Sequence, residues 1–186
     1  MSVTVIKIFH NDKFNDLIEW VIYIVLAILL ALFINKFVIF NANIPTGSME
    51  KTIMTGDKLF VSRLSFIFQE PKRFDIAVFK YPDAPVGEEV LYVKRIIGLP
   101  GEKVEIVNGK VYINDSDGPL RDDFVNGKPR QDNYGPYFVP QDSYFMLGDN
   151  RNNSVDSRFW RHPFVNKKNL IGKPVFRYSK KFGFVN

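Results

Sequence analysis

Two residue types in this sequence can together do nucleophilic chemistry, and they lie far apart along the chain. Ser48 lies in the turn-forming segment Ile44–Met49, which reads Ile-Pro-Thr-Gly-Ser-Met. A nucleophilic serine needs a neighbouring base to take its proton. The chain has no cysteine and only two histidines; His10 precedes a long apolar segment and His162 stands in an unremarkable polar stretch. Lysine is therefore the base to look for, and Lys94 is the candidate. Together, Ser48 and Lys94 predict hydrolysis by a serine nucleophile with a lysine base.

An apolar segment lies directly before the serine. Val21–Ile34 is uninterrupted, and Leu17–Phe40 is mainly apolar. Spanning a bilayer takes about 20 such residues, so we predict a transmembrane helix over residues 17–40. A buried core helix and a cleavable signal peptide are the alternatives, but Asn41–Asn43 lacks small residues at both cleavage-specificity positions, so we expect the segment to be retained. Lysines flank the segment on both sides, so they do not decide its orientation: Lys7, Lys13, Lys36, Lys51 and Lys58.

Composition narrows the class of protein. The 186 residues allow one domain of moderate size, and 46% hydrophobic and 15% aromatic residues suffice for a core rich in strands. The net charge of +5 fits an anionic membrane surface, whereas basic residues that are scattered among acidic ones disfavour nucleic acid. The absence of cysteine excludes disulfides and thiol catalysis, and two histidines make no ligand cluster, so we expect no metal and no cofactor.

Beyond Asn41 the pattern changes to short apolar runs separated by Gly, Pro, Asn and Asp, which is typical of strands. Asn108-Gly109 predicts a hairpin with a type I′ turn, and Asp115–Tyr134 predicts a polar surface excursion. We therefore expect a mainly β fold, an antiparallel sheet domain over residues 41–186 with an excursion near 115–140, tethered by one N-terminal transmembrane helix. The expected strands are Lys58–Val61, Asp75–Lys80, Leu91–Ile97, Lys103–Val107, Lys110–Ile113, Tyr144–Leu147 and Ile171–Arg177.

Four segments are ordinary when taken singly but specific in their order after a membrane span. They read P-T-G-S-M at Pro45–Met49, G-D-K-L-F-V at Gly56–Val61, K-R-I-I-G-L-P-G at Lys94–Gly101 and G-D-N-R-N-N-S-V-D-S-R at Gly148–Arg158. From about residue 40 to 176 the chain resembles the type I signal peptidases, membrane-bound serine proteases that remove signal peptides from exported proteins. One departure is Lys51, where the family usually has proline.

The resemblance implies that Ser48 is the nucleophile and Lys94 the general base. A free lysine has a pKa of about 10.4, so a base working near neutral pH needs a pKa lower by about 3 units. Desolvation can supply this, and the apolar neighbours of Lys94 are suited to such a pocket. The resemblance further implies that Ser154 orients the lysine and that Asp156 and Arg158 form a supporting polar pair. It also implies an oxyanion site made by the Ser48 N–H and the Thr46 hydroxyl.

The family cleaves after small residues in an Ala-x-Ala pattern. We expect an extended substrate to pair as an added strand with Ile44–Thr46 on one side and Leu91–Val93 on the other. Alternate substrate side chains would then enter shallow pockets that admit alanine and exclude larger groups. The predicted substrate-binding residues are Ile44, Pro45, Met49, Leu91, Val93 and Ile96. Strand alternation points Arg95 to the opposite face, towards a structural or surface role.

Two other classes remain open. Self-cleaving repressor peptidases share a Ser/Lys core, but they are soluble, which the helix over residues 17–40 argues against. A non-catalytic relative that serves the assembly of pilin-like surface proteins is the other alternative, and the presence of both Ser48 and Lys94 argues against it.

The expected partners are preproteins and the lipid bilayer, and not nucleic acid; the oligomeric state stays open. The expected location is the cell membrane, with residues 1–16 in the cytoplasm and the β domain outside. Phe66–Phe68 is either a core strand or an apolar edge that dips into the bilayer.

Overall fold

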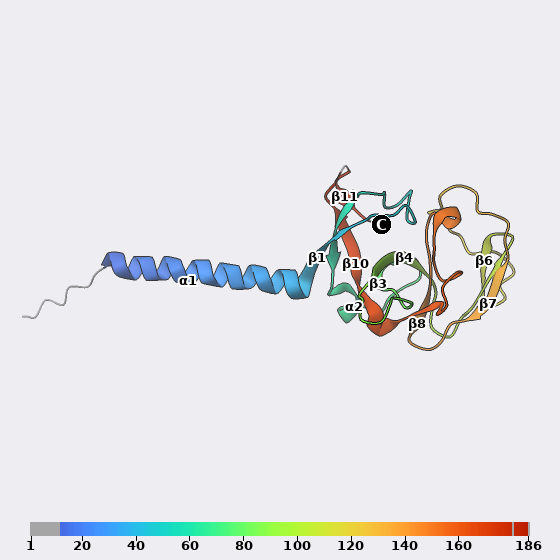
Figure 1. The fold of residues 1–186 in the computed structure, drawn as a ribbon, viewed down its shortest axis with the longest axis horizontal. Coiled ribbons are helices and arrows are strands. Elements are labelled where there is room, and N and C mark those ends of the chain that lie inside the picture. Colours follow the sequence, from blue (N-terminus) through green and yellow to red (C-terminus); the bar gives the residue numbers. More distant parts are fainter. Residues whose placement is uncertain (1–11, 180, 186) are drawn as a thin grey trace, which may run out of the picture. The chain divides into compact units, whose positions relative to one another are not determined.

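The computed structural model describes residues 12–179 and 181–185 (Figure 1). The chain divides into two units, Met1–Val38 and Ile39–Asn186. Most of the expected N-terminal tail, including His10 and Lys7, lies outside the described residues.

The described part of the first unit, residues 12–38, is helical throughout. Helix α1 (Asp12–Phe33) continues into the π-helical turn η1 (Ile34–Val38). The 23 residues Asp16–Val38 are long and apolar enough to cross a membrane, and none of this stretch is buried within the protein. The sequence placed the end of the helix at Phe40, two residues too far. Ile39 and Phe40 instead belong to strand β1, because they pair with Ser62 and Val61.

Most of the second unit is an antiparallel sheet of eight strands. Its order is β1-β2-β10-β3-β4-β8-β9, and β11 pairs with β10. The strands are β1 (Ile39–Asn43), β2 (Lys58–Ser62), β3 (Ile76–Lys80), β4 (Leu91–Gly98), β8 (Ser143–Leu147), β9 (Phe164–Asn166), β10 (Leu170–Arg177) and β11 (Gly183–Phe184). Short helical turns α2 (Ser65–Phe68), η2 (Arg151–Asn153) and η3 (Lys167–Asn169) connect them.

A second, three-stranded sheet has the order β6-β5-β7. Its strands are β5 (Lys103–Val107), β6 (Lys110–Ile113) and β7 (Tyr134–Phe138). In Figure 1, β6 and β7 lie at the end of this unit opposite to β1 and β11. The predicted hairpin is confirmed: Val107 pairs with Lys110, and Asn108 and Gly109 have the positive φ angles, 50° and 74°, of a type I′ turn.

The mainly antiparallel β fold is confirmed, and each expected strand is present within one residue of its expected bounds. The sequence did not predict β1, β7, β9 and β11. Strands β9 and β11 are only three and two residues long. Asparagine in β1 and Gly135-Pro136 in β7 are disfavoured in strands, but β7 is an edge strand, where proline is tolerated. The polar excursion therefore ends at about residue 133, which agrees with the stretch Asp115–Tyr134 and is short of residue 140.

Three apolar clusters form the core. The first lies under the serine segment and includes Met49, Ile53, Leu59 and Val78. The second includes Phe79, Ile96, Met146 and Trp160, and the third, which joins the two sheets, includes Ile97, Val104, Ile106 and Phe145. The core-strand alternative for residues 66–68 is wrong, because these residues form the turn α2 and leave Ile67 and Phe68 69% and 78% exposed.

Candidate active site

The serine is held by the loop that returns from β1 to β2. The N–H of Ile44 donates to Asp57 O (3.0 Å) and the N–H of Gly56 donates to Ile44 O (2.8 Å), which closes the loop at its base. Met49 and Ile53 anchor the loop in the first apolar cluster. From the other side, Asn150 donates its N–H to Ser48 O (3.0 Å) and its side-chain amide to Gly47 O (3.1 Å). The Ser48 peptide is therefore fixed from both sides.

Strand β4 brings the lysine to the serine. Lys94 pairs with Ala77 of β3, and its Nζ donates to Ser48 Oγ over 2.5 Å. The two residues are 46 positions apart and both are buried, with 4% and 7% of their surface exposed. The structure thus brings together the two residues that the sequence singled out.

The surroundings of Lys94 favour its neutral amine. Burial lowers the pKa of Lys94 from 10.5 to about 8, while the carboxylates of Asp156 and Asp149 oppose this and the Arg158 guanidinium assists it. A neutral amine at hydrogen-bond distance can accept the hydroxyl proton of Ser48, which makes the oxygen a nucleophile.

Ser154 lies close to the serine segment but does not make the expected hydrogen bond to the lysine. Its Oγ is buried and has no hydrogen-bond partner within the described residues. Ser154 packs against Gly148. A Cβ atom added to Gly148 would collide with the Ser154 side chain and lie 2.5 Å from Ser48 O. The hydrogen bond that the resemblance implied from Ser154 to Lys94 is therefore not formed in this structure, in which Lys94 Nζ donates to Ser48 instead.

Asp156 and Arg158 form the polar pair that the resemblance implied. The Arg158 guanidinium donates to both carboxylate oxygens of Asp156, over 2.8 and 2.9 Å, and to Arg151 O over 2.8 Å. Asp156 also accepts the N–H of Gly148 (3.0 Å). The pair fixes the loop that packs against Ser48, and it adds one carboxylate and one guanidinium to the field around Lys94.

A groove of about 630 Å³ opens beside Ser48. Five of the six expected substrate-binding residues line it: Ile44, Pro45, Met49, Leu91 and Val93. Thr46, the expected second oxyanion donor, also lines the groove, and its side chain is exposed. In the described part of the chain, the Ser48 N–H has no hydrogen-bond acceptor, so it remains able to donate to a ligand.

Ile96 is not a groove residue. It is fully buried in the second apolar cluster and pairs with Met146 of β8. The physical reason is that β8 pairs with β4 from Arg95 onwards, so the two residues beyond Lys94 are enclosed by their neighbours.

Before Arg95, among the described strands, Leu91–Lys94 pairs on one side only, with β3. Strand β1 likewise pairs only with β2.

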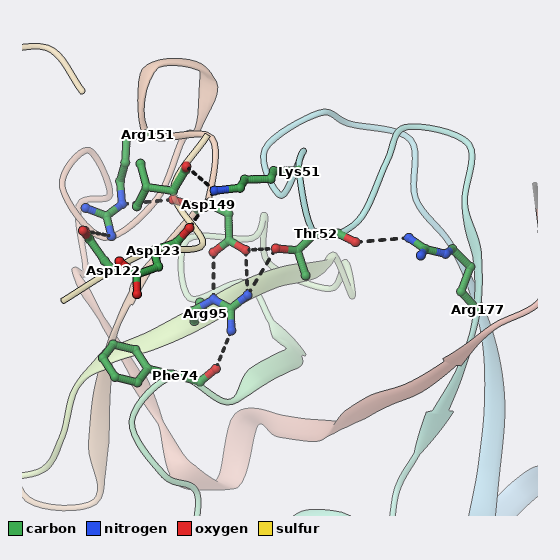
Figure 2. Close-up of polar contacts among 11 residues, drawn as sticks. Lys51, Thr52, Phe74, Arg95, Asp122, Asp123, Asp149, Arg151 and Arg177 are labelled. Carbon is green, nitrogen blue, oxygen red and sulfur yellow. Dashed lines mark hydrogen bonds and ion pairs between the residues drawn. The ribbon is translucent and has the colours of Figure 1, made fainter. Parts of the chain in front are cut away.

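Sequence reasoning missed a buried ion pair beside the lysine, shown in Figure 2. Arg95 donates from Nε and Nη2 to the two carboxylate oxygens of Asp149, over 2.8 and 2.7 Å, and the Thr52 hydroxyl donates to the same carboxylate over 2.6 Å. Arg95 does point away from Lys94 as alternation predicted, but it is 4% exposed and not on the surface. A second charged residue beside Lys94 in the otherwise apolar run Tyr92–Leu99, with an aspartate in a later motif, was the available signal.

The remaining sequence candidates lie elsewhere. The His162 ring Nδ1 lies 2.5 Å from Asp83 Oδ1, on an exposed loop, and His162 is not among the residues that line the groove. In the described residues, no group of three or more His, Cys, Asp and Glu side chains is arranged to hold a metal ion.

Comparison with known proteins identifies the class. A family model described as signal peptidase, peptidase S26, matches residues 17–179. "Signal peptidase I" of Leptolyngbya laminosa is 41% identical over 169 residues, which cover 88% of this chain and 80% of that protein. "Signal peptidase I S" of Bacillus subtilis is 37% identical over 176 residues, which cover 89% of this chain and 90% of that protein. A crystal structure of a signal peptidase I from Enterococcus faecalis is 32% identical, covers 56% of this chain and 97% of that chain, and gives a TM-score of 0.46. This chain belongs to the peptidase S26 family of signal peptidases.

Proposed function

We propose that this protein is a membrane-anchored serine endopeptidase that removes signal peptides from exported preproteins, with Ser48 as nucleophile and Lys94 as general base. The observation that carries the proposal is the 2.5 Å contact between Lys94 Nζ and Ser48 Oγ, in a buried position beside a mainly apolar groove. The family assignment supports the substrate class. The non-catalytic alternative is not favoured, because both residues are present and in contact.

The proposed reaction uses these residues in the following roles. Neutral Lys94 takes the proton of Ser48 as Oγ attacks the scissile carbonyl carbon, and the oxyanion of the tetrahedral intermediate is stabilised by the Ser48 N–H and the Thr46 hydroxyl. Lys94 then gives the proton to the departing amine, which leaves as the new N-terminus of the mature protein. Water attacks the acyl-enzyme while Lys94 takes its proton; the ester bond then breaks, and Lys94 gives this proton to Ser48 Oγ, which regenerates both residues.

The groove accounts for a preference for small side chains. An extended substrate would pair with the unpaired edge of Leu91–Val93 and lie along Ile44–Thr46, since both segments line the groove. Alternate substrate residues would then point towards Ile44, Met49 and Val93, where we expect shallow pockets. Alanine fits such a pocket, and a larger group is excluded by overpacking.

The helix would anchor the enzyme in the cell membrane with its N-terminus in the cytoplasm and the β domain outside. Length and composition support a single span. Protease added to intact protoplasts should digest the β domain, and full protection of that domain would contradict this orientation. A band of full-length size on immunoblots of membranes would also exclude removal of the helix.

The test of function is direct. The purified full-length protein is incubated in detergent with a preprotein, and the N-terminus of the product is sequenced; a cut after an Ala-x-Ala sequence is expected. Ser48→Ala and Lys94→Ala should reduce cleavage to background while the domain stays folded. Lys94→Arg should fail as well, because a guanidinium does not deprotonate in a protein. Full activity in Lys94→Arg would exclude Lys94 as the base.

Specificity is tested on the substrate. Leucine placed immediately before the scissile bond should nearly abolish cleavage, whereas leucine at the next residue upstream should cost little because that side chain faces outward. Equal cleavage of the two substrates would refute the pocket argument without affecting the roles of Ser48 and Lys94.

A further inference from the structure

The polar excursion, which the function has not used so far, lies against two of the motifs, Lys94–Gly101 and Gly148–Arg158, and against the turn that carries Ser48. Five of its residues, Asp122–Asn126, make these contacts, and we refer to them as the 122–126 segment. Figure 2 shows the aspartates of this segment next to Lys51, Asp149 and Arg151. The sequence treated the same residues as a solvated loop.

Two contacts bind the 122–126 segment to the loop that packs on Ser48. Asn126 donates its N–H to Asp149 O over 2.8 Å. The Asp122 carboxylate forms an ion pair with Arg151 at 2.9 Å, and the Arg151 side chain is only 3% exposed. Both contacts join residues more than 20 positions apart, so the segment is tied to the motif loop by tertiary structure and not by its own turn.

A third contact reaches the strand that carries Lys94. The Arg95 guanidinium stacks over the Phe124 ring at 4.1 Å from its centroid, and the Phe124 ring packs against Phe74 at 5.3 Å. Because Arg95 also donates to Phe74 O over 2.8 Å, the ring covers an arginine that is already fixed by hydrogen bonds. The segment thereby closes over the buried Arg95–Asp149 pair.

The fourth contact reaches the nucleophile turn itself, through Lys51. Lys51 Nζ donates to Asp123 O over 2.6 Å and to Val125 O over 3.2 Å (Figure 2). Lys51 belongs to the turn of Ser48, in which Glu50 N–H donates to Gly47 O and Thr52 N–H donates to Met49 O, each over 3.1 Å.

The backbone at Lys51 adds an independent observation. Its φ angle is 89°, in a region that residues with a side chain rarely adopt and that proline, with φ fixed near −65°, does not adopt. Such a conformation persists only where the surroundings hold it. Within the described residues, the hydrogen bonds of the Lys51 side chain go to the two carbonyls of the 122–126 segment.

We propose that the 122–126 segment positions the nucleophile turn, and that Lys51 is the positioning residue that couples the segment to Ser48. Lys51 touches neither substrate nor the reacting atoms; it holds the turn so that Ser48 Oγ stays within reach of Lys94. The inference rests on the proposed function for its kinetic consequence, but its structural consequence is measurable without activity.

The experiment compares full-length Lys51→Met, which keeps the length of the side chain but loses the ammonium, with the wild type. The matched control is Arg121→Met, which removes one positive charge from an exposed pair with Asp123 and leaves the Lys51 contacts in place. Amide hydrogen exchange at Glu50, Thr52 and Ile53 should accelerate in Lys51→Met and not in Arg121→Met, because these amides donate within the nucleophile turn.

Cleavage of a preprotein provides the second readout. We expect kcat of Lys51→Met to fall by about tenfold, since misplacement by about 1 Å costs on the order of a hundredfold. KM should stay unchanged, because Lys51 does not line the groove. Lys51→Arg should restore most of kcat, whereas Lys51→Gly, which fits the positive φ but lacks the ammonium, should not.

The outcomes separate the two proposals. Unchanged exchange at the turn in both Lys51→Met and Lys51→Gly would overturn the positioning role, whether or not the wild type cleaves the substrate. A lower melting temperature with unchanged kcat at low temperature would overturn it too, because this result shows a purely stabilising role. An inactive wild type would contradict the proposed function, while accelerated exchange would still support the coupling of Lys51 to the turn.

Discussion

The lysine base makes a quantitative prediction about pH. Burial lowers the pKa of Lys94 to about 8, so about one tenth of the protein carries the neutral amine at pH 7 and about nine tenths at pH 9. If the neutral amine is the base, kcat/KM should rise nearly tenfold between these two values and level off above pH 9. The assay is cleavage of a fluorogenic preprotein peptide from pH 6 to 10 at constant ionic strength.

The same pKa has a consequence for stability, with a defined sign. The unfolded chain holds the Lys94 proton up to a pKa of 10.5 and the folded chain only to about 8. Between these values the unfolded state binds more protons, so the free energy of unfolding rises with pH. Below pH 8 the buried amine costs the folded state about 3 kcal/mol.

Lys94→Met isolates this cost, because it removes the titrating group and keeps an apolar side chain of similar length. The variant should resist urea better than the wild type at pH 7, and this advantage should shrink by about 3 kcal/mol as pH rises from 8 to 10.5. A difference in unfolding free energy that does not depend on pH would refute the lowered pKa. A kcat/KM that falls as pH rises from 7 to 9 would refute the role of neutral Lys94 as base.

Three further predictions concern single side chains. Arg95→Met should lower the free energy of unfolding in urea by about 3 to 5 kcal/mol, because it leaves Asp149 charged, buried and unpaired; a loss below about 1 kcal/mol would show that the carboxylate is solvated. Gly148→Ala should cost most of the kcat for preprotein cleavage because its Cβ would displace the nucleophile peptide, whereas Gly118→Ala, whose Cβ meets nothing within 4 Å, should not. His162→Ala should keep substantial activity and change the melting temperature little, because the His162 side chain is 65% exposed; an inactive variant would point to a histidine mechanism.

Several features of this protein are determined by local sequence. The apolar run before Ser48 predicted the helix because length and hydropathy suffice for that inference, and Asn108-Gly109 predicted its turn because both residues tolerate positive φ. The scarcity of histidine and the absence of cysteine pointed to a lysine base before any contact was known. The strands of the sheet domain followed from short apolar runs between turn-forming residues, although pairing alone revealed the polar strand β1.

Tertiary structure decided what depends on residues that are distant in sequence. The pKa of Lys94 is set by burial, and burial arises only when β4, the Ser48 turn and the loop of Asp156 pack together. Alternation gave the direction of Arg95 but not its burial, because Asp149, 54 positions later, covers it. Ile96 was misassigned to the groove because pairing with β8 begins between it and Lys94. The partners of Lys51 are two backbone carbonyls, groups that every residue carries, so no pattern of side chains in the sequence could indicate them.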